Sequence, residues 1–135
     1  MEEIIMWTAE LVSRRSTCSR RVKVGAVLAD IGGRIIATGY NGVPRHMDHC
    51  DDVGCVLDEA GIHCLRAIHA EENAILQCAY YGISTDGLIL YTTVRPCERC
   101  AVRLLQAGIR KVFYLQDYGG YYTPPRMTIE RFVKP

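Results

Sequence analysis

Three residues of types that bind zinc lie in two short motifs of this chain. His69 precedes Glu71 by two positions, and Cys97 and Cys100 follow, with Pro96 directly ahead of the two cysteines. One imidazole and two thiolates make three protein ligands, and a catalytic zinc keeps its fourth tetrahedral position open for water. A carboxylate two residues after the histidine is placed beside such a metal, where it can move protons for that water. The motifs therefore predict a hydrolytic zinc centre with Glu71 as its acid and base.

The spacing of these residues predicts that two helix N-termini hold the site. Cys97 and Cys100 are three residues apart, so one face of a helix carries both sulfurs. The positive end of that helix, expected over about 97–107, favours the thiolate form that a metal needs. Apolar residues recur at helical spacing after His69 and predict a second helix over about 68–82. The first turns of both helices are expected to face one metal.

A less specific interpretation of the cysteine pair remains open. A lone Cys-x-x-Cys in an intracellular protein also occurs in redox sites and as half of a structural zinc site. Glu71 distinguishes these cases, because a structural site does not need a proton shuttle. Replacement of Glu71 by Ala is expected to leave a structural site almost unchanged and to abolish turnover in a catalytic one.

The composition of the chain is that of an ordinary globular protein. Of its 135 residues, 49% are hydrophobic and 23% are charged, which predicts one core and a single domain over 1–135. A net charge of +1 and a pI near 7.6 give no strong field for nucleic acid or a membrane surface. We find no signal peptide or membrane-spanning run, and the seven cysteines suit metal binding in a reducing compartment. We therefore expect a cytoplasmic protein that binds neither membranes nor nucleic acid.

Strand and helix patterns predict the layers that position the two motifs. Besides the two helices above, the expected elements are a helix over 2–16, strands over 24–29 and 34–40 joined by a turn, and strands over 88–93 and 111–115. Strand–helix–strand units of this length imply parallel pairing with right-handed crossovers. This predicts an α/β fold with three layers, α/β/α, around a mixed five-stranded sheet. The apolar residues of the segment 41–66 recur at neither helical nor strand spacing.

The C-terminal region departs from this alternation. Two glycines and two prolines lie between residues 117 and 127 and exclude a helix there. We expect the last helix to be missing and residues 127–133 to form the fifth strand directly. A parallel crossover without a helix is sterically difficult, so this strand is expected to run antiparallel to its neighbour. The sheet face left bare would be apolar, which predicts burial against another subunit.

Four segments together resemble the deoxycytidylate (dCMP) deaminases of the cytidine deaminase superfamily. They are Val24-Gly25-Ala26-Val27, Gly39-Tyr40-Asn41-Gly42-Val43-Pro44, His69-Ala70-Glu71-Glu72-Asn73 and Pro96-Cys97-Glu98-Arg99-Cys100. The last two carry the H-x-E and P-C-x-x-C signature of zinc nucleobase deaminases. The resemblance implies that His69, Cys97 and Cys100 bind zinc and that Glu71 relays protons. It also implies hydrolysis of dCMP to dUMP and ammonia, supply of dUMP for thymidylate synthesis, and homo-oligomers, usually hexamers.

The resemblance also points to residues that contact the nucleotide. It places Asn41 near the bound nucleotide, although Asn-Gly is equally an ordinary turn dipeptide, and Asn73 is within reach of the sugar. Arginine is favoured for a phosphate, while each surface cation taken alone is more often simply solvated. The cations considered for the 5′-phosphate are Arg20, Arg21, Lys23, Arg45 and Arg66. Many family members bind dCTP as activator and dTTP as inhibitor near this turn, so both are candidate effectors.

A second metal site is predicted from the remaining cysteines and histidines. Some relatives hold a structural zinc with cysteines near Cys18 and Cys55, and four ligands close a tetrahedral site. The preferred set is Cys18, Cys50, Cys55 and His63, with Cys64, His49 or His46 as substitutes. Such a metal would order the long period-free stretch. The alternative is a set of reduced thiols, and a zinc content near one per chain would exclude the second site.

Three other functions share parts of this pattern. A tRNA adenosine deaminase has the same zinc signature, but it needs a basic face that a net charge of +1 does not support. Free-nucleoside deaminases commonly carry cysteine at the position of His69. A zinc-stabilised nucleotide-binding module without activity leaves Glu71 unexplained.

Overall fold

The centre of the computed structural model is a mixed five-stranded sheet. The structure describes residues 1–18, 21–118 and 122–134. The strands are β1 (Gly25–Ala29), β2 (Ile35–Tyr40), β3 (Ile89–Val94), β4 (Lys111–Gln116) and β5 (Thr128–Arg131), in the spatial order β2-β1-β3-β4-β5. β1 pairs antiparallel with β2 and with β3, whereas β3, β4 and β5 are parallel. The predicted mixed sheet of five strands is confirmed.

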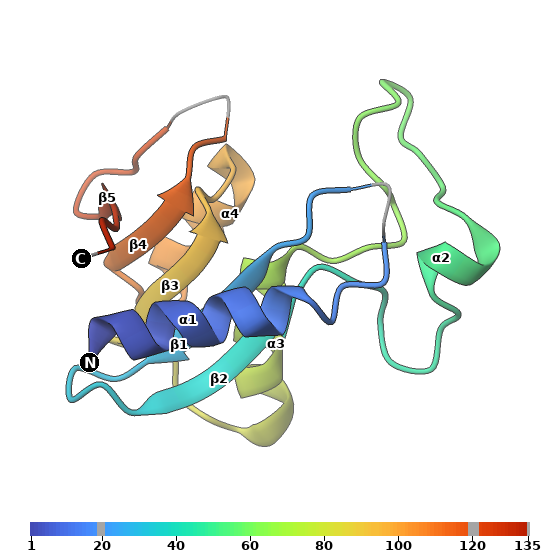
Figure 1. Cartoon of the computed structure of the whole chain (residues 1–135). Coiled ribbons are helices and arrows are strands. Elements are labelled where there is room, and N and C mark those ends of the chain that lie inside the picture. The colour runs from blue at the N-terminus through green and yellow to red at the C-terminus, as the bar shows by residue number, and fades with distance from the viewer. Residues whose placement is uncertain (19–20, 119–121, 135) are drawn as a thin grey trace.

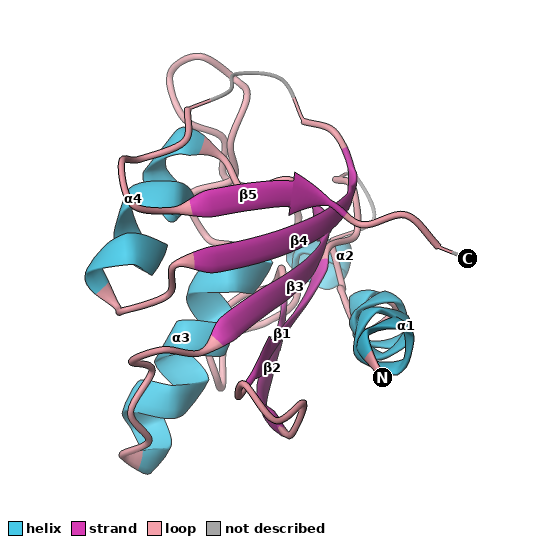
Figure 2. Cartoon of the chain, turned by 90° about the vertical axis from the view of Figure 1, so that its left-hand side faces the viewer, coloured by secondary structure: helices cyan, strands magenta, loops and turns pink. Residues whose placement is uncertain are grey.

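Helices cover both faces of this sheet, which gives the predicted three layers. α1 (Glu2–Ser13) lies on one face, and α3 (Ala70–Tyr81) and α4 (Glu98–Gln106) lie on the other (Figure 2). Because side chains alternate along a strand, Leu90 packs toward α3 and α4 while Tyr91 packs toward α1. None of the helices in the described ranges is long and apolar enough to cross a membrane.

The long elements lie within a few residues of their predicted bounds, but one short helix was missed. α1 ends at Ser13 rather than near residue 16, and α2 (Cys50–Val53) lies in the stretch that shows no period. A helix of one turn is too short for a period to appear in the sequence. α2 and its flanking loops project from one end of the sheet (Figure 1). We refer to residues 45–66 as the lobe.

The direction predicted for β5 is wrong. The fifth strand follows β4 without an intervening helix in the described residues, as expected, but it pairs parallel to β4, with Lys111 opposite Thr128 and Tyr114 opposite Arg131. An extended chain covers about 3.3 Å per residue, so the residues between the two strands are numerous enough to return along β4 without a helix. Pro124 and Met127 are buried on this return path.

The C-terminal segment also covers the sheet face that was expected to be bare. Phe113 of β4 is only 8% exposed, because Tyr91 stacks on its ring at 5.2 Å and Phe132 meets it edge-on at 6.2 Å. Lys134 then bridges to Glu10 of α1 with a nitrogen–oxygen distance of 2.6 Å. The chain therefore buries this apolar face itself, and the expectation that another subunit covers it is not supported.

β2 and α3 approach each other so closely at Gly39 that only glycine fits. A Cβ at this position would lie 2.2 Å from the carbonyl oxygen of Ala70 and 2.5 Å from the amide nitrogen of Ala74, both of which are helix backbone. Gly39→Ala is expected to lower the free energy of unfolding by about 3 kcal/mol, because the helix must move away from the sheet. Urea denaturation measures this loss. Gly32→Ala is the control, since its Cβ would meet only the Asp30 carboxylate at 3.4 Å, and an equal loss in both variants would contradict the steric explanation.

Candidate functional site

The three predicted zinc ligands converge at the N-termini of α3 and α4. His69 is the N-cap of α3, Cys97 is the N-cap of α4, and Cys100 lies in the first turn of α4. Nδ1 of His69 lies 3.7 Å from Sγ of Cys97 and 3.3 Å from Sγ of Cys100. All three ligand atoms lie within 4.8 Å of one another. We call this group the first cluster.

The spacing in the first cluster fits a zinc ion. Tetrahedral zinc with Zn–S near 2.3 Å and Zn–N near 2.0–2.1 Å places a nitrogen and a sulfur ligand about 3.6 Å apart. The two distances from His69 lie on either side of this value. With one nitrogen and two sulfurs as donors, the fourth position of the ion is left for a non-protein ligand.

Glu71 adds a buried carboxyl group to the first cluster. It lies in the first turn of α3 and is 5% exposed. Burial raises the pKa of Glu71 to about 7, while the nearby His69 ring and a hydrogen bond from Cys100 act in the opposite direction. A carboxyl group of this kind can both accept and release a proton near neutral pH.

The two thiols of the first cluster differ in their tendency to ionise: the pKa of Cys97 is lowered, whereas the hydrogen bond with Cys97 and burial raise the pKa of Cys100. The hydrogen bond from Cys100, followed by the interaction with His69, lowers the pKa of Cys97 to about 3 in the metal-free protein. The pKa of His69 is raised, chiefly by its hydrogen bond with Cys97. Cys97 is therefore a thiolate before any metal arrives, and thiolate is the form that binds zinc.

A pocket of about 300 Å³ opens directly over the first cluster. His69, Glu71 and Cys97 form part of its wall, and Arg21, His63 and Arg95 are the other basic side chains there. Asn41 and Tyr118 add neutral polar groups to the wall. Among the described residues of the wall, Glu71 is the one that carries a carboxylate. The remaining wall is mainly apolar and includes Val22, Val24, Ile62, Ala67, Ile68 and Val94. The pocket is therefore suited to a flat apolar group that carries an anionic substituent.

Of the two asparagines predicted to contact nucleotide, the structure places only Asn41 in the pocket wall. Its Oδ1 accepts a hydrogen bond from the backbone N–H of Val24 at 2.8 Å, and its Nδ2 donates to the carbonyl of Val22 at 3.0 Å. Asn73 donates to the carbonyl of Tyr40 at 2.6 Å and is outside the pocket wall. Asn73 therefore holds the end of β2, next to Asn41.

The predicted phosphate cations Arg45 and Arg66 are not brought to the pocket. The guanidinium of Arg45 lies 4.1 Å from the ring centroid of Tyr80 on α3. Arg66 donates hydrogen bonds to the carbonyls of Gly54 at 3.0 Å and Asp48 at 2.5 Å, inside the lobe. Both side chains are long enough to point away from the pocket, and their positions in the sequence do not fix their direction.

Arg21 is in the pocket wall, and Arg95 is a wall residue that the sequence reasoning missed. Arg95 donates to the Tyr114 hydroxyl at 3.3 Å and to Thr123 Oγ1 at 3.1 Å. Its place directly after the carboxyl end of β3 was a usable signal, because ligand sites of α/β proteins lie at the carboxyl ends of their strands. Lys23 is not in the wall, and Arg20 lies outside the described residues.

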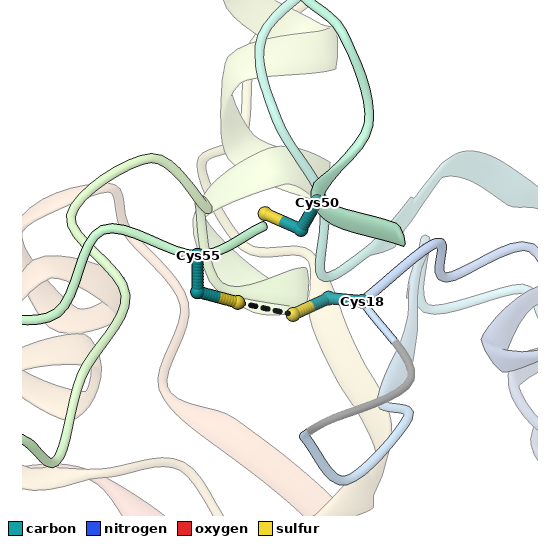
Figure 3. Close-up of side chains that lie close together, drawn as sticks. All are labelled: Cys18, Cys50 and Cys55. Atoms are coloured by element: carbon teal, nitrogen blue, oxygen red, sulfur yellow. Dashed lines mark hydrogen bonds between the residues drawn. The ribbon is translucent and has the colours of Figure 1, made fainter. Parts of the chain in front are cut away.

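A second group of thiols lies at the base of the lobe. Sγ atoms of Cys18, Cys50 and Cys55 lie within 4.8 Å of one another, and those of Cys18 and Cys55 are 3.4 Å apart (Figure 3). Cys64 adjoins them, with its Sγ 3.8 Å from that of Cys50. Tetrahedral zinc with four thiolates places the sulfurs about 3.8 Å apart. The sulfurs of Cys18, Cys50 and Cys55 are close enough together to share an ion, and Cys64 is at this distance from Cys50 but lies outside the set of sulfurs mutually within 4.8 Å. We call these four residues the cysteine cluster.

The structure does not bring the predicted fourth ligand, His63, to the cysteine cluster. Nδ1 of His63 pairs with Oδ2 of Asp58 at 3.2 Å, and its ring stacks toward that of His69 at 6.1 Å. His63 and Cys64 are adjacent and both line the pocket, but only the Cys64 sulfur also approaches the other thiols. His49, a substitute in the prediction, has its Nδ1 3.0 Å from Thr17 Oγ1.

The surroundings of the cysteine cluster favour the thiolate form of Cys64 and disfavour that of Cys18 and Cys50. Although burial opposes it, hydrogen bonds from three backbone N–H groups lower the pKa of Cys64 to about 7. Burial raises the pKa of Cys50 to about 12 and also raises that of Cys18, so a metal must displace protons from these two thiols. Nη1 of Arg66 lies 3.7 Å from Sγ of Cys50 and offsets negative charge there.

The sheet and the first cluster together define a class of protein. A mixed five-stranded sheet between helix layers, with one histidine and two cysteines at two helix N-termini, is the cytidine deaminase-like α/β arrangement. The chain belongs to the family described as the cytidine and deoxycytidylate deaminase zinc-binding region, whose model matches residues 1–116.

Two curated relatives illustrate the similarity in sequence. The chain is 45% identical over 116 residues to ComE operon protein 2 of Bacillus subtilis and 38% identical over 121 residues to the deoxycytidylate deaminase of Saccharomyces cerevisiae. These alignments cover 86% and 87% of this chain. The chain spans 59% and 38% of the lengths of these relatives.

Solved structures show the same similarity in three dimensions. The dCMP deaminase of cyanophage S-TIM5 in apo form superposes with a TM-score of 0.75 at 32% identity, and the match covers 96% of this chain and 95% of that chain. The same enzyme in complex with dCMP and dUMP superposes with a TM-score of 0.74 at 40% identity, covering 87% and 82%.

Proposed function

We propose that this chain catalyses the zinc-dependent hydrolytic deamination of dCMP to dUMP and ammonia. The observation that carries the proposal is the first cluster, with the buried Glu71 beside it, at the base of a pocket that is also lined by Arg21, His63 and Arg95. The similarity to a cyanophage enzyme whose structure contains dCMP and dUMP supports this substrate. We include in the proposal that residues 1–135 form one domain and that the protein is cytoplasmic, where thiol ligands stay reduced.

In this mechanism the chain's own residues bind the ion and move the protons. His69 through Nδ1, and Cys97 and Cys100 through their sulfurs, hold the zinc. The ion supplies a Lewis acid that makes water a nucleophile at neutral pH. Glu71 takes one proton of the attacking water and delivers it to N3 of the cytosine ring. It then takes the second proton from the hydroxyl group left on C4 and passes it to the amine, which departs as ammonia while C4 becomes a carbonyl. The apolar wall excludes bulk water from these transfers.

Arg21 and Arg95 replace Arg45 and Arg66 as the proposed phosphate ligands, because they are the arginines of the pocket wall. Arg95 is held by Tyr114 and Thr123, and Arg21 donates a hydrogen bond to the carbonyl of Ile62. Guanidinium groups that are already positioned lose little entropy when they bind a phosphate. Asn41 is proposed to shape the wall beside the sugar through its bonds to residues 22 and 24.

Arg95→Met is expected to lower kcat/KM for dCMP by about 10- to 100-fold, because a charge-assisted bond to phosphate is worth about 1.5–3 kcal/mol. Turnover of deoxycytidine, which has no phosphate, should change by less than about threefold. Steady-state kinetics with both substrates measure the ratio. Arg45→Met is the matched control, since Arg45 stacks on Tyr80 outside the pocket. Equal losses for both substrates in Arg95→Met would contradict the phosphate contact.

The cysteine cluster is proposed to hold a second, structural zinc. The ligands are Cys18, Cys50, Cys55 and Cys64, which close a tetrahedral site and leave no position for substrate. The metal would tie residue 18, near the end of α1, to both ends of the lobe. Because Cys64 and Ile62 lie in or beside the pocket wall, this zinc would also shape the substrate site.

Ammonia release from four substrates tests the proposed activity. We expect turnover of dCMP, weaker turnover of deoxycytidine and dCTP, and none of a tRNA anticodon stem-loop. Preference for the stem-loop would favour a tRNA adenosine deaminase, and preference for deoxycytidine would favour a nucleoside enzyme. Release from none of them, with zinc bound, would favour a non-catalytic binding module. Addition of dCTP and dTTP to the dCMP assay tests the proposed regulation, and the mass in solution tests the proposed homo-oligomer, for which a hexamer is expected.

A further inference from the structure

The four thiols of the cysteine cluster lie in two close pairs (three of the four are drawn in Figure 3). Sγ of Cys18 lies 3.4 Å from Sγ of Cys55, and Sγ of Cys50 lies 3.8 Å from Sγ of Cys64. A disulfide bond is about 2.05 Å long, so the sulfurs of each pair need to approach each other by less than about 2 Å. Small movements of the lobe loops therefore suffice for two disulfides.

Each of these pairs combines a buried thiol with a partly exposed one. Cys18 is 1% exposed and Cys50 is 5% exposed, whereas Cys55 and Cys64 are partly open to solvent. Oxidation of two thiols by a peroxide begins at a sulfur that the oxidant can reach and is completed by a second thiol beside it. Cys55 and Cys64 therefore suit the first step, and Cys18 and Cys50 suit the second.

Backbone hydrogen bonds hold the segments that carry these thiols together without an ion. The N–H of Asp51 donates to the carbonyl of Thr17 at 3.0 Å, and the N–H of Leu65 donates to the carbonyl of Val56 at 2.7 Å. All four of these residues directly adjoin a cysteine of the cluster. The sulfurs therefore stay near one another while the first product of oxidation waits for its partner.

We propose that the cysteine cluster is a site of reversible oxidation by peroxides, at which the pairs Cys18–Cys55 and Cys50–Cys64 become disulfides. In each pair, the partly exposed thiolate attacks one oxygen of hydrogen peroxide, the O–O bond breaks, and a sulfenic acid and a hydroxide ion form. The buried thiolate then attacks the sulfenic sulfur, and the S–O bond breaks as the S–S bond forms, releasing a second hydroxide ion. Two sulfurs are oxidised and the two peroxide oxygens are reduced.

Disulfide formation removes the ligands of the zinc ion proposed for the cluster. A disulfide sulfur carries no negative charge, so the ion is released. The substrate pocket changes as well, because Cys64 lies in its wall and Arg21, three residues after Cys18, donates to the carbonyl of Ile62 there. The effect on dCMP rests on the proposed function, whereas the pairing of the thiols does not.

Peptide mapping of the purified protein after treatment with hydrogen peroxide and alkylation tests the pairing. Both disulfides should appear, and a metal indicator should record zinc release over the same time. Cys78 is the internal control, since it is fully buried in the core and should remain a thiol. Both disulfides without zinc release would support the pairing and refute only the second zinc. A Cys18–Cys50 or Cys50–Cys55 disulfide, or oxidation no faster than that of Cys78, would overturn the proposal.

Two single variants separate the pairs, and kinetics test the link to the pocket. Cys55→Ser should form only the Cys50–Cys64 disulfide, and Cys64→Ser only Cys18–Cys55, with circular dichroism as the check on folding. In oxidised wild-type protein whose map shows Cys97 still reduced, KM for dCMP should rise at least about fivefold and recover with dithiothreitol and zinc. Peroxide should not change KM in the Cys55→Ser/Cys64→Ser protein, which can form neither disulfide. An unchanged KM with both disulfides formed would overturn the link to the pocket.

Discussion

Glu71→Gln is expected to lower kcat for dCMP by about 100- to 10,000-fold while zinc stays bound. Glutamine has nearly the same shape as glutamate, so it can occupy the same buried position in the first turn of α3. It cannot accept the proton of the attacking water or release one to the leaving amine. The ligands His69, Cys97 and Cys100 are untouched, so the metal site persists. Steady-state ammonia release gives the kinetic loss, and elemental analysis of the purified protein gives the zinc content.

Glu72→Gln is the matched control for this experiment. Glu72 is the next residue on α3, and its Oε2 pairs with Nη1 of Arg103 on α4 at 3.4 Å, so its carboxylate serves packing between the two helices. This variant should retain kcat within about threefold, because a partly exposed ion pair contributes little. The proton-transfer role would be refuted if Glu71→Gln kept more than about a tenth of the activity. A variant that lost both activity and zinc would assign Glu71 to the metal instead.

Cys64→Ser is expected to reduce the zinc content from two ions per chain to one and to loosen the lobe. Removal of one thiolate leaves the three sulfurs of Cys18, Cys50 and Cys55, and zinc affinity falls steeply with the loss of a ligand. Hydrogen exchange of residues 45–66 should accelerate, since few apolar side chains pack inside the lobe and six large ones are exposed there. The exposed ones are Met47, Val53, Val56, Leu57, Ile62 and Leu65.

His63→Ala separates the two ligand sets proposed for this metal. If Cys64 is the fourth ligand, His63→Ala keeps two zinc ions per chain, because the His63 ring pairs with Asp58 and faces the pocket. The sequence prediction, with His63 as the ligand, expects the reverse result in the two variants. A zinc content near one in the unmodified protein would refute the second site altogether.

The residues of the first cluster could be identified from sequence because their relations are local. A histidine at the start of one helix, and a Cys-x-x-Cys at the start of another, are each fixed within a single helical turn. Strand and helix periods then predicted which elements join them, and their order brings both helix N-termini to one end of the sheet. The mixed sheet, the three layers and the missing last helix followed from the same short-range patterns.

Contacts between segments that are distant in the sequence were decided only by the tertiary structure. The direction of β5 depends on whether an extended chain can return along β4, and the covering of Phe113 depends on where Phe132 then lies. The choice between His63 and Cys64 depends on the backbone direction in the lobe, where the sequence shows no period. Arg45, Arg66 and Arg95 have long side chains whose targets lie in other elements. Sequence patterns encode relations within a turn or a strand, whereas these choices depend on which surfaces meet after folding.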